Sequence, residues 1–443
     1  MQKAMGYQTE YKTKRTDSHT AVEQIGSDSI VGIGQAACQP PALMQALAER
    51  AGAGKVDNVK VYYMHSEEHM KNSLLRYELM GRIKPYCMFM QATERELVKK
   101  GVEDGNRKVV YFVPNSFSQS IRFFTEHIEL DTFLVTVSPM DRHGYFTFGT
   151  NNDYTSTAAR HAKRLIVEVN QHMPRVFGRS LLHVSEVAAI VENDVPLLAL
   201  KERPIQEHER KLGARVAELI PDRACLQIGV GGVPSGVCEA LMDRTDLGIH
   251  TEVFNPALAR LVQRGAVTNK WKNINPGKTV FTFAMGDQAF YDFMDDNISL
   301  ESHPVNYVND PAVIAQNDRV VSVNSTIEMD LTGACNSEHV HGHQFTATGG
   351  QLDFVRGAYA SKDGLSIIAF QSSIKNGTIS KIVPRLAGPV TTPRTDTHYV
   401  VTENGVVNLK GLSSTERALA LINLADPAFR ENLLAEAKQL HLV

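Results

Sequence analysis

The hydrophobic positions of the first half of the chain form short apolar runs, with stretches of helical spacing between them. A run of about four to eight apolar residues is typical of a strand buried on both faces, whereas apolar residues three and four apart indicate a helix. This alternation predicts a mostly parallel sheet covered by helices. Between residues 18 and 195 the segments are SIVGIG, the helical ALMQALAERA, VKVYYM, KVVYFVP, TFLVTVSP and RLIVEV.

The stretch from 224 to 256 combines these elements around one carboxylate. Its apolar run ACLQIGV predicts a strand, the glycines that follow predict a tight turn, and Pro234 predicts the start of a helix. LGIHTEVF predicts the next strand, and Glu252 lies near the carboxyl end of that strand. Open α/β sheets place their ligand sites at such strand ends, so Glu252 is a candidate functional residue.

The rest of the second half continues in the same way. Asn255 suits the N-cap of a helix and Pro256 its first residue, so a helix should follow the Glu252 strand directly. Near the end of the chain, Asp426 and Pro427 interrupt a helical pattern, which predicts two closing helices. Further segments of the same α/β pattern are RKLGARVAELI, KTVFTFAMG, RVVSVNSTIEMDLTG, ATGGQLDFVRGA and LSIIAFQSS.

The segment VENDVPLLALKERPIQEHE, over about 191 to 208, combines two prolines with charge and has no clear periodicity. Such a composition is typical of a connection between domains. We therefore expect an N-terminal α/β domain over 1–204 and a C-terminal α/β domain over 205–443. The fold class expected is α/β, with two open α/β/α domains built on mostly parallel sheets.

The composition narrows the class of protein. The 443 residues are 43% hydrophobic and 21% charged with a formal net charge of -3, which disfavours strong attraction to nucleic acid or an anionic membrane. No run approaches about 18 apolar residues and the first 20 residues lack the apolar core of a signal peptide, so we expect a cytoplasmic protein. The five cysteines contain no CxxC pair, which disfavours a zinc ribbon or a disulfide framework.

The turn Gly229–Val233 is a candidate cradle for a phosphate or for coenzyme A. The free backbone N–H groups at the start of a helix, next to a glycine turn, form an anion site. Glycine turns of this kind also occur in α/β proteins for packing alone. A dinucleotide site is the rival interpretation, because Glu252 lies about where such folds place a ribose-binding acid. The GxGxxG frame fails, however, since its last position is Pro234, and no GK[ST] follows to complete a P-loop.

Glu252 has two interpretations from the residues alone. It is either a strand-end carboxylate that accepts backbone N–H bonds, or a carboxylate nucleophile, which must be ionised, shielded from water and faced by fixed donors. The glycine turns at 229–232 and 349–350 could supply those donors. The helix after the second turn carries Asp353 and Arg356, which could instead simply pair with each other on one helix face.

The histidines of EHVHGHQ, at positions 339, 341 and 343, suggest a metal site at first sight. A zinc site normally has further His, Cys or carboxylate ligands in a recognisable frame, and the sequence shows none, so we expect a polar loop near a pocket and no metal. No GxSxG, HExxH or cysteine-nucleophile pattern occurs, which leaves hydrolases of those classes without support.

Several long motifs occur in one order along the chain: QIGVGGVP, GIHTEVF, VNSTIEMDLTGACNSE, ATGGQLDFVRGA, IVPRL and VTTPRTDTHYVVTENGV, with VSPMDRHGYFTFGTNNDYT and NQHMPRVFG in the first half. With these motifs the sequence resembles the acetyl-CoA hydrolase/transferase family over nearly its full length. Within that family it is most similar to the 4-hydroxybutyrate and butyryl-CoA:acetate CoA-transferases.

The resemblance implies two open α/β domains with an active site in the cleft between them, and ping-pong transfer of coenzyme A between carboxylic acids. It implies that Glu252 is the catalytic glutamate, which forms a glutamyl-CoA thioester. It also implies a coenzyme A-binding loop and further coenzyme A contacts, with no metal and with a homodimer or higher homo-oligomer. The residues of the loop are Gly229, Val230, Gly231, Gly232 and Val233, and the further contacts are Ile327, Gly350 and Lys375.

Three alternative functions stay open. An acyl-CoA hydrolase would use the same residues, with water intercepting the glutamyl-CoA thioester. The other two, a non-catalytic coenzyme A-binding regulator and a dinucleotide-dependent oxidoreductase, belong to a different class. The family pattern is altered at Asn255–Pro256, at Cys38–Pro41 and at Asn404. The acyl group stays open among acetyl, butyryl, 4-hydroxybutyryl, succinyl and itaconyl.

Overall fold

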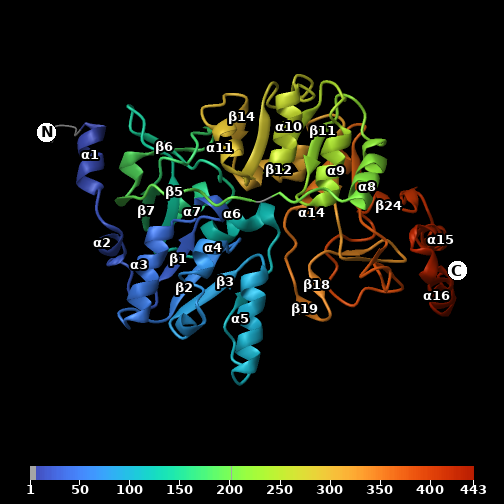
Figure 1. Ribbon diagram of the computed structural model, residues 1–443, viewed down its shortest axis with the longest axis horizontal. Coiled ribbons are helices and arrows are strands. Elements are labelled where there is room, and N and C mark those ends of the chain that lie inside the picture. The colour runs from blue at the N-terminus through green and yellow to red at the C-terminus, as the bar shows by residue number, and fades with distance from the viewer. Residues whose placement is uncertain (1–5, 201) are drawn as a thin grey trace. The chain divides into compact units, whose positions relative to one another are not determined.

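The computed structural model describes residues 6–200 and 202–443 (Figure 1). The chain forms two compact units that are not contiguous in sequence. Unit 1 comprises Met1–Asn115, Gln119–Lys201 and Val280–Tyr307, and unit 2 comprises Ser116–Ser118, Glu202–Thr279 and Val308–Val443. The expected domain boundary at 204/205 stays a prediction.

Unit 1 is built on a seven-stranded sheet in which every pairing is parallel. Strand β5 is buried at all six positions, as expected for a sheet with helices on both faces. In spatial order the strands are β10 (Ala189–Glu192), β7 (Arg164–Val169), β5 (Thr132–Val137), β1 (Ile30–Ile33), β2 (Val59–Tyr63), β3 (Ile83–Cys87) and β4 (Tyr111–Phe112).

The remaining elements of unit 1 are helices and short strands. The helices are α1 (Tyr7–Lys14), α2 (Ser18–Val22), α3 (Pro41–Gly52), α4 (Glu68–Lys71), α5 (Ala92–Glu103), α6 (Ser120–Arg122), α7 (Thr155–His161), α11 (Gln288–Met294) and the first residues of α12 (Val305–Val308). The short strands form two pairs, β6 (Tyr145–Thr147) with β9 (Leu181–His183), and β8 (Phe177–Gly178) with β14 (Leu300–Ser302). Strand β13 (Thr279–Ala284) also belongs to unit 1, except for its first residue.

Unit 2 contains six consecutive sheet strands, which are parallel except for the edge strand β25. In spatial order they are β25 (Gly405–Asn408), β24 (Tyr399–Thr402), β20 (Leu365–Ala369), β15 (Val320–Asn324), β11 (Cys225–Ile228) and β12 (Gly248–Phe254). The helices are α8 (Glu207–Ala217), α9 (Gly232–Ala240), α10 (Pro256–Arg264), α13 (Pro311–Ile314), α14 (Gln351–Ala360), α15 (Ser414–Leu424) and α16 (Pro427–Gln439).

Short strands complete unit 2. They form a three-stranded group of β17 (Cys335–Asn336), β16 (Glu328–Asp330) and β23 (Ile382–Val383), and two hairpins, β18 (His339–Val340) with β19 (His343–Gln344) and β21 (Ser373–Ile374) with β22 (Ile379–Ser380).

The expected fold class, α/β with mostly parallel sheets, is confirmed. Helix α10 begins as expected, because the Asn255 side chain accepts the Leu258 N–H and Pro256 is the first helical residue. The two closing helices are separated at Asp426, which caps α16. Two expectations differ in detail: α9 starts at Gly232, two residues before Pro234, and only two residues of KVVYFVP form a strand.

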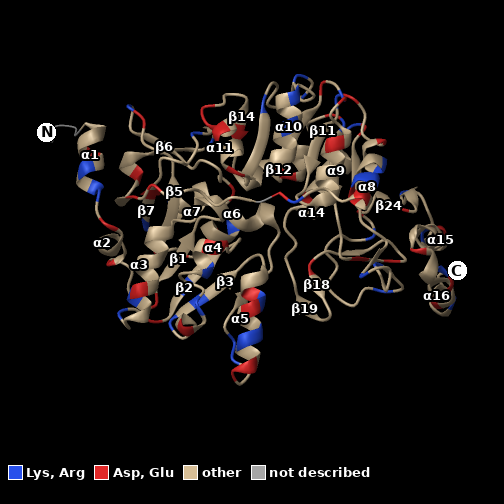
Figure 2. Cartoon of the chain, viewed as in Figure 1, with Lys and Arg blue, Asp and Glu red and all other residues tan. Residues whose placement is uncertain are grey.

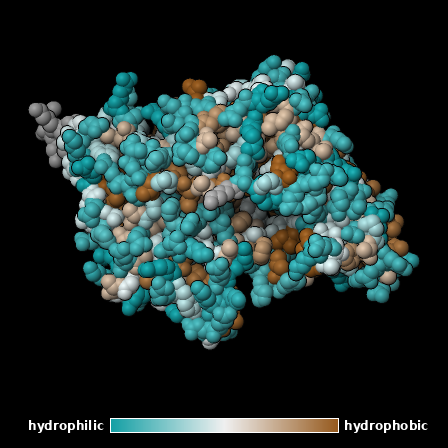
Figure 3. All heavy atoms as spheres, in the orientation of Figure 1, coloured by the Kyte–Doolittle hydropathy of each residue, from teal (hydrophilic) through white to brown (hydrophobic). Residues whose placement is uncertain are grey.

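Charge and hydropathy are distributed as in an ordinary folded protein. Acidic and basic residues alternate along α5, and both signs occur in both units (Figure 2). The face seen in Figure 3 is mostly hydrophilic, with hydrophobic residues in small groups. Among the described residues, no helix combines the length and the apolar character needed to span a bilayer.

Candidate active site

Glu252 is the one position of β12 that is not fully buried. Its neighbours along the strand are buried because β12 lies within the sheet, and the chain leaves the strand two residues later through the Asn255 cap of α10. The side chain therefore lies at the carboxyl end of a parallel strand, partly shielded from water. The sequence predicts this position for a functional carboxylate.

Two donors engage the Glu252 carboxylate. The side-chain Nδ2 of Asn309 donates to Glu252 Oε2 at 2.6 Å, and the backbone N–H of Gly350 also donates to the carboxylate. Asn309 is completely buried. A carboxylate held by an amide and a backbone N–H has a fixed orientation, which a nucleophile requires.

Gly350 is adjacent to this carboxylate because it has no side chain. A Cβ at this position would overlap Glu252 Oε2 and Asn309 Nδ2. The residue is also the N-cap of α14, so its N–H belongs to the positive end of a helix. The structure thus places two predicted site residues, Glu252 and Gly350, in direct contact.

A second buried carboxylate belongs to the same cluster. Asp353, in the first turn of α14, accepts hydrogen bonds from the Ser118 Oγ at 2.8 Å and from the Ser118 N–H at 3.2 Å. Asp353 lies close enough to Glu252 for its negative charge to raise the pKa of that carboxylate. The sequence alternative that Asp353 pairs with Arg356 is not what the structure shows, since Arg356 pairs with Asp396 at 3.0 Å.

The pKa of Glu252 is raised to about 7, chiefly because burial disfavours the charged carboxylate. The Asn309 and Gly350 hydrogen bonds act in the opposite direction, whereas the nearby charge of Asp353 raises the pKa further. Burial likewise raises the pKa of Asp353 to about 6. Perturbed carboxylates of this kind are concentrated at functional sites, and a pKa near 7 keeps the nucleophile ionisable at neutral pH.

The Gly229–Val233 turn connects β11 to α9, and its glycines have separate structural causes. Gly231 has φ +130°, which a residue with a side chain rarely adopts. A Cβ on Gly232 would overlap the carboxylate of Glu209, which pairs with Arg203 beside it. Val230, between them, is 55% exposed and available to a ligand.

This turn is linked to the strand that carries Glu252. The Asn255 side-chain Nδ2 donates to the Gly229 carbonyl at 3.4 Å, while the same side chain caps α10. The end of β12 and the start of the glycine turn are therefore tied together in unit 2. Val233 lies in the first turn of α9.

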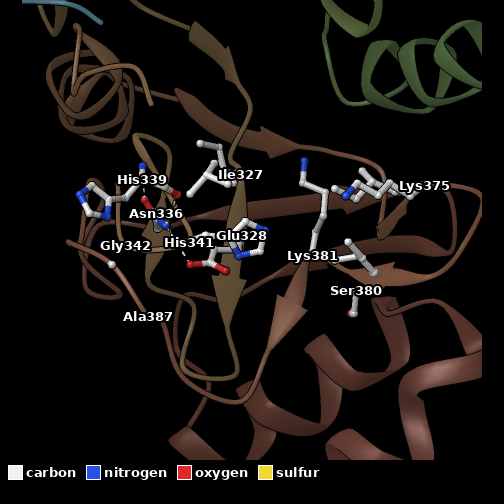
Figure 4. A pocket seen from close by; sticks show the side chains of 14 residues that line it. Ile327, Glu328, Asn336, His339, His341, Gly342, Lys375, Ser380, Lys381 and Ala387 are labelled. Atoms are coloured by element: carbon white, nitrogen blue, oxygen red, sulfur yellow. Dashed lines mark hydrogen bonds between the residues drawn. The ribbon is translucent and has the colours of Figure 1, made fainter. Parts of the chain in front are cut away.

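Ile327 and Lys375, two predicted coenzyme A contacts, line one cavity of about 320 Å³ (Figure 4). Lys381 lies there too, and burial lowers its pKa to about 8. Its ammonium lies 5.1 Å from the centre of the Phe370 ring. Among the described residues that line this cavity, neither Glu252 nor any residue of the Gly229–Val233 turn occurs.

The histidine run forms a small hairpin. His339 belongs to β18 and His343 to β19, with His341 in the turn between them. His339 and His341 line the cavity of Ile327, as expected for a polar loop near a pocket, while His343 does not. No group of three or more His, Cys, Asp or Glu residues suited to a metal occurs in the part of the chain that the structure describes.

Sequence reasoning missed Asn309, Ser118 and Lys381. Asn309 precedes Asp310 and Pro311, which signal the start of α13, and this local signal conceals its contact with Glu252. Ser118 reaches the site from a position 235 residues before Asp353 in the chain. No periodicity or motif singles out either residue.

Two family models match this chain. Residues 1–201 match the model of the acetyl-CoA hydrolase/transferase N-terminal domain, and residues 286–437 match that of the C-terminal domain. A succinyl-CoA:cyclohexane-1-carboxylate CoA transferase of Geobacter metallireducens is 40% identical over 99% of this chain and 98% of its own. A 4-hydroxybutyrate coenzyme A transferase of Clostridium kluyveri is 38% identical over 98% of this chain and 100% of its own.

A solved structure is also similar over the full chain. The crystal structure of RipA from Yersinia pestis is 55% identical, covers 99% of this chain and 100% of its own, and gives a TM-score of 0.97.

Proposed function

The chain belongs to the acetyl-CoA hydrolase/transferase family, and from this premise we propose that it transfers coenzyme A between short-chain or small dicarboxylic acids by a ping-pong mechanism through Glu252. The two relatives are named CoA transferases, which supports an acyl-CoA and a carboxylic acid as its substrates. No metal has a role in this mechanism.

One observation carries the proposal. Glu252 lies at a strand end with a pKa of about 7, and Asn309 and Gly350 both donate to its carboxylate. Asn309 engages Oε2, which leaves Oε1 to attack an acyl carbonyl. A shielded carboxylate of raised basicity and fixed orientation is what nucleophilic attack on a thioester requires.

The first half-reaction consists of two acyl transfers. Oε1 of Glu252 attacks the thioester carbonyl, the C–S bond breaks, and a mixed anhydride and the coenzyme A thiolate form. The thiolate then attacks the glutamyl carbonyl of the anhydride. The first acid leaves as a carboxylate, taking the bridging oxygen from Glu252, and a glutamyl-CoA thioester remains.

In the second half-reaction the acceptor carboxylate repeats these steps in reverse. It attacks the glutamyl-CoA thioester, and the released thiolate attacks the acceptor's acyl carbonyl. The products are the new acyl-CoA and a Glu252 carboxylate that now contains one oxygen from the acceptor. No oxidant, reductant or metal is needed for the balance.

The donor on Oε2 has a second role in this scheme. When the thiolate attacks the glutamyl carbonyl, negative charge develops on Oε2, where the Asn309 amide already lies. Preorganised donors at such an oxygen stabilise the tetrahedral intermediate. A carboxylate is suited to this chemistry because its anhydride and thioester retain bond energy that a serine ester would lose.

We assign coenzyme A contacts to the Gly229–Val233 turn, to Gly350, and to Ile327 and Lys375. The exposure of Val230 and the shared cavity of Ile327 and Lys375 support this assignment. The cations in that cavity suit the phosphates of coenzyme A.

Oxygen isotope transfer tests the mechanism directly. The protein is turned over with an unlabelled acyl-CoA and an acceptor acid, such as acetate or succinate, that carries ¹⁸O in its carboxylate. We expect the peptide containing Glu252 to gain the label. A label-free peptide after confirmed transfer would contradict the mechanism, and label entering from ¹⁸O-water instead would show hydrolysis of the glutamyl thioester.

A further inference from the structure

We propose that the cavity lined by Ile327 and Lys375 recognises the phosphate groups of coenzyme A through the ammonium group of Lys381, while the turn Gly229–Val233 contacts the uncharged pantetheine part. The inference rests on the proposed transfer of coenzyme A. It assigns a role to a shielded cation that the bond-forming steps do not use, and it predicts how the protein distinguishes an acyl-CoA from a thioester without phosphates.

The backbone of Lys381 is fixed on both sides. Its N–H donates to the Ser372 carbonyl at 2.8 Å, and its carbonyl accepts the Met329 N–H at 2.8 Å. The residue directly precedes β23, and in the view of Figure 4 its side chain extends between those of Ile327 and Lys375. The ammonium therefore has a defined place in the cavity.

The ammonium of Lys381 has no ion-pair partner in the part of the chain that the structure describes. Its Nζ forms no hydrogen bond there either, and it lies 5.1 Å from the centre of the Phe370 ring. Glu328, the one carboxylate among the described lining residues, instead accepts a hydrogen bond from Asn336 at 2.8 Å. A largely buried cation is costly unless an anion pairs with it, so the cavity suits an anionic ligand.

Lys375 supplies a second cation of a different kind. It lies with Asn376 in the turn of the β21–β22 hairpin, where the two residues have left-handed backbones with φ of +50° and +57°. Lys375 is exposed, so water and salt weaken its attraction for an anion. The shielding of Lys381 preserves the effect of its charge, and this residue should therefore contribute most of the discrimination between charged and uncharged ligands.

The glycine turn is less suited to a phosphate, although it leads into the start of α9. A Cβ on Gly232, the first residue of that helix, would overlap the carboxylate of Glu209, so an acid already lies against the helix start. This carboxylate is paired with Arg203, and a phosphate placed there would compete with it for the same cation. The exposed Val230 instead offers an apolar contact, which suits the uncharged pantetheine chain.

Binding of a phosphate should change the protonation of Lys381. Burial lowers the pKa of this ammonium to about 8, against the opposing effect of the Glu403 charge. An anion in the cavity favours the charged form, so the bound protein should hold the proton to higher pH and take up part of a proton near pH 8. The other titratable groups that line the cavity or act on Lys381 are Glu328, His339, His341, Lys375 and Glu403.

The test is equilibrium binding of acetyl-CoA and of acetyl-pantetheine to the full chain, measured by calorimetry between about pH 7 and 9. All variants are made together with Glu252→Gln, so that no transfer occurs. We expect Lys381→Met to weaken the binding of acetyl-CoA about tenfold or more at neutral pH and to leave that of acetyl-pantetheine unchanged. Lys381→Arg should restore the preference for acetyl-CoA, because it restores the charge.

The same titrations, repeated in buffers of different ionisation enthalpy, measure proton uptake. In the parent protein the affinity for acetyl-CoA should fall as the pH rises above about 8, with uptake of a fraction of a proton, because the free protein loses its ammonium charge. Lys381→Arg should remove both effects, since a guanidinium stays charged in this range. Lys438→Met, at an exposed position of α16, is the matched control and should behave like its parent.

Equal losses of affinity for acetyl-CoA and acetyl-pantetheine in Lys381→Met, or no loss for either, would overturn the proposal. If Lys381→Met does not fold, Lys381→Arg decides the question, because proton uptake that persists in this variant would exclude Lys381 as its source. Failure of the proposed function appears differently, as a wild-type protein that binds acetyl-CoA but transfers no coenzyme A to any acceptor acid.

Discussion

Unit 2 contains two glycine turns at strand-to-helix junctions, and they are glycine-rich for different reasons. In the first, before α9, Gly231 is required by its positive φ, and Gly232 faces the carboxylate of Glu209 on α8. In the second, before α14, Gly350 faces the carboxylate of Glu252. Each turn thus lies against an acid, but Glu209 is an ion-paired helix-capping residue, whereas Glu252 is partly exposed with a raised pKa.

The first turn and its helix serve packing, whereas the second turn serves chemistry. The first helix continues the packing role, because a Cβ on Gly236 would lie 2.7 Å from the Glu209 carbonyl oxygen of α8. The second turn combines its N–H with the Asn309 amide on one carboxylate. Glycines of α9 should therefore affect stability, and Gly350 should affect the reaction.

The largest expected effect belongs to Glu252 itself. Glu252→Gln keeps an oxygen for the Asn309 and Gly350 donors but removes the nucleophile, so we expect kcat to fall on the order of 1,000-fold or more with the fold intact. Steady-state transfer and circular dichroism measure the two quantities. Glu431→Gln, at an exposed position of α16, is the control and should retain wild-type kcat.

Gly350→Ala should have the second-largest effect on the reaction. Its Cβ would overlap Glu252 Oε2, so the carboxylate must shift, and a displacement of roughly 1 Å costs about 100-fold in rate. We expect a folded protein with a large fall in kcat/KM. Near-wild-type kinetics would show that the contact of Gly350 with Glu252 is unimportant.

The change of kcat/KM with pH should be an effect of intermediate size, smaller than those of Glu252→Gln and Gly350→Ala. Because burial raises the pKa of Glu252 to about 7 and only the ionised form attacks, kcat/KM should be constant above that pH and fall about tenfold per unit below it. The pH at which kcat/KM begins to fall should be independent of the acceptor acid, since kcat/KM for the acyl-CoA reports the free enzyme. An acidic limb near pH 4.5 would contradict the raised pKa.

Gly236→Ala should have the smallest effect on the reaction. Its Cβ would press against the backbone of α8, and overpacking of this kind costs about 1–3 kcal/mol of stability. We expect a lower melting temperature and a kcat close to that of the wild type. A change in kcat as large as that of Gly350→Ala would remove the distinction between the two turns.

Local chemistry explains what the sequence predicts well. Asn255 and Pro256 start α10 through backbone preferences that depend on near neighbours only, and this start places Glu252 at the strand end. The mostly parallel sheets follow from fully apolar runs. The shortness of β4 within KVVYFVP does not follow, because pairing with β3, and not propensity, sets its two residues.

The partners of Glu252 could not be predicted because they are brought to it by tertiary structure. Asn309 and Ser118 are single polar residues whose side chains meet Glu252 and Asp353 across long sequence separations. The sequence also does not show which carboxylate folds against each glycine, Glu209 against Gly232 and Glu252 against Gly350.

The most direct test of the central claim, that Glu252 is a covalent nucleophile, is the mass of the protein after incubation with acetyl-CoA or butyryl-CoA and borohydride trapping. We expect a coenzyme A adduct or a reduced side chain mapped to Glu252 in the wild type and absent from Glu252→Gln. A wild type that stays unmodified with a broad panel of acyl-CoAs, or an adduct that persists in Glu252→Gln, would contradict it.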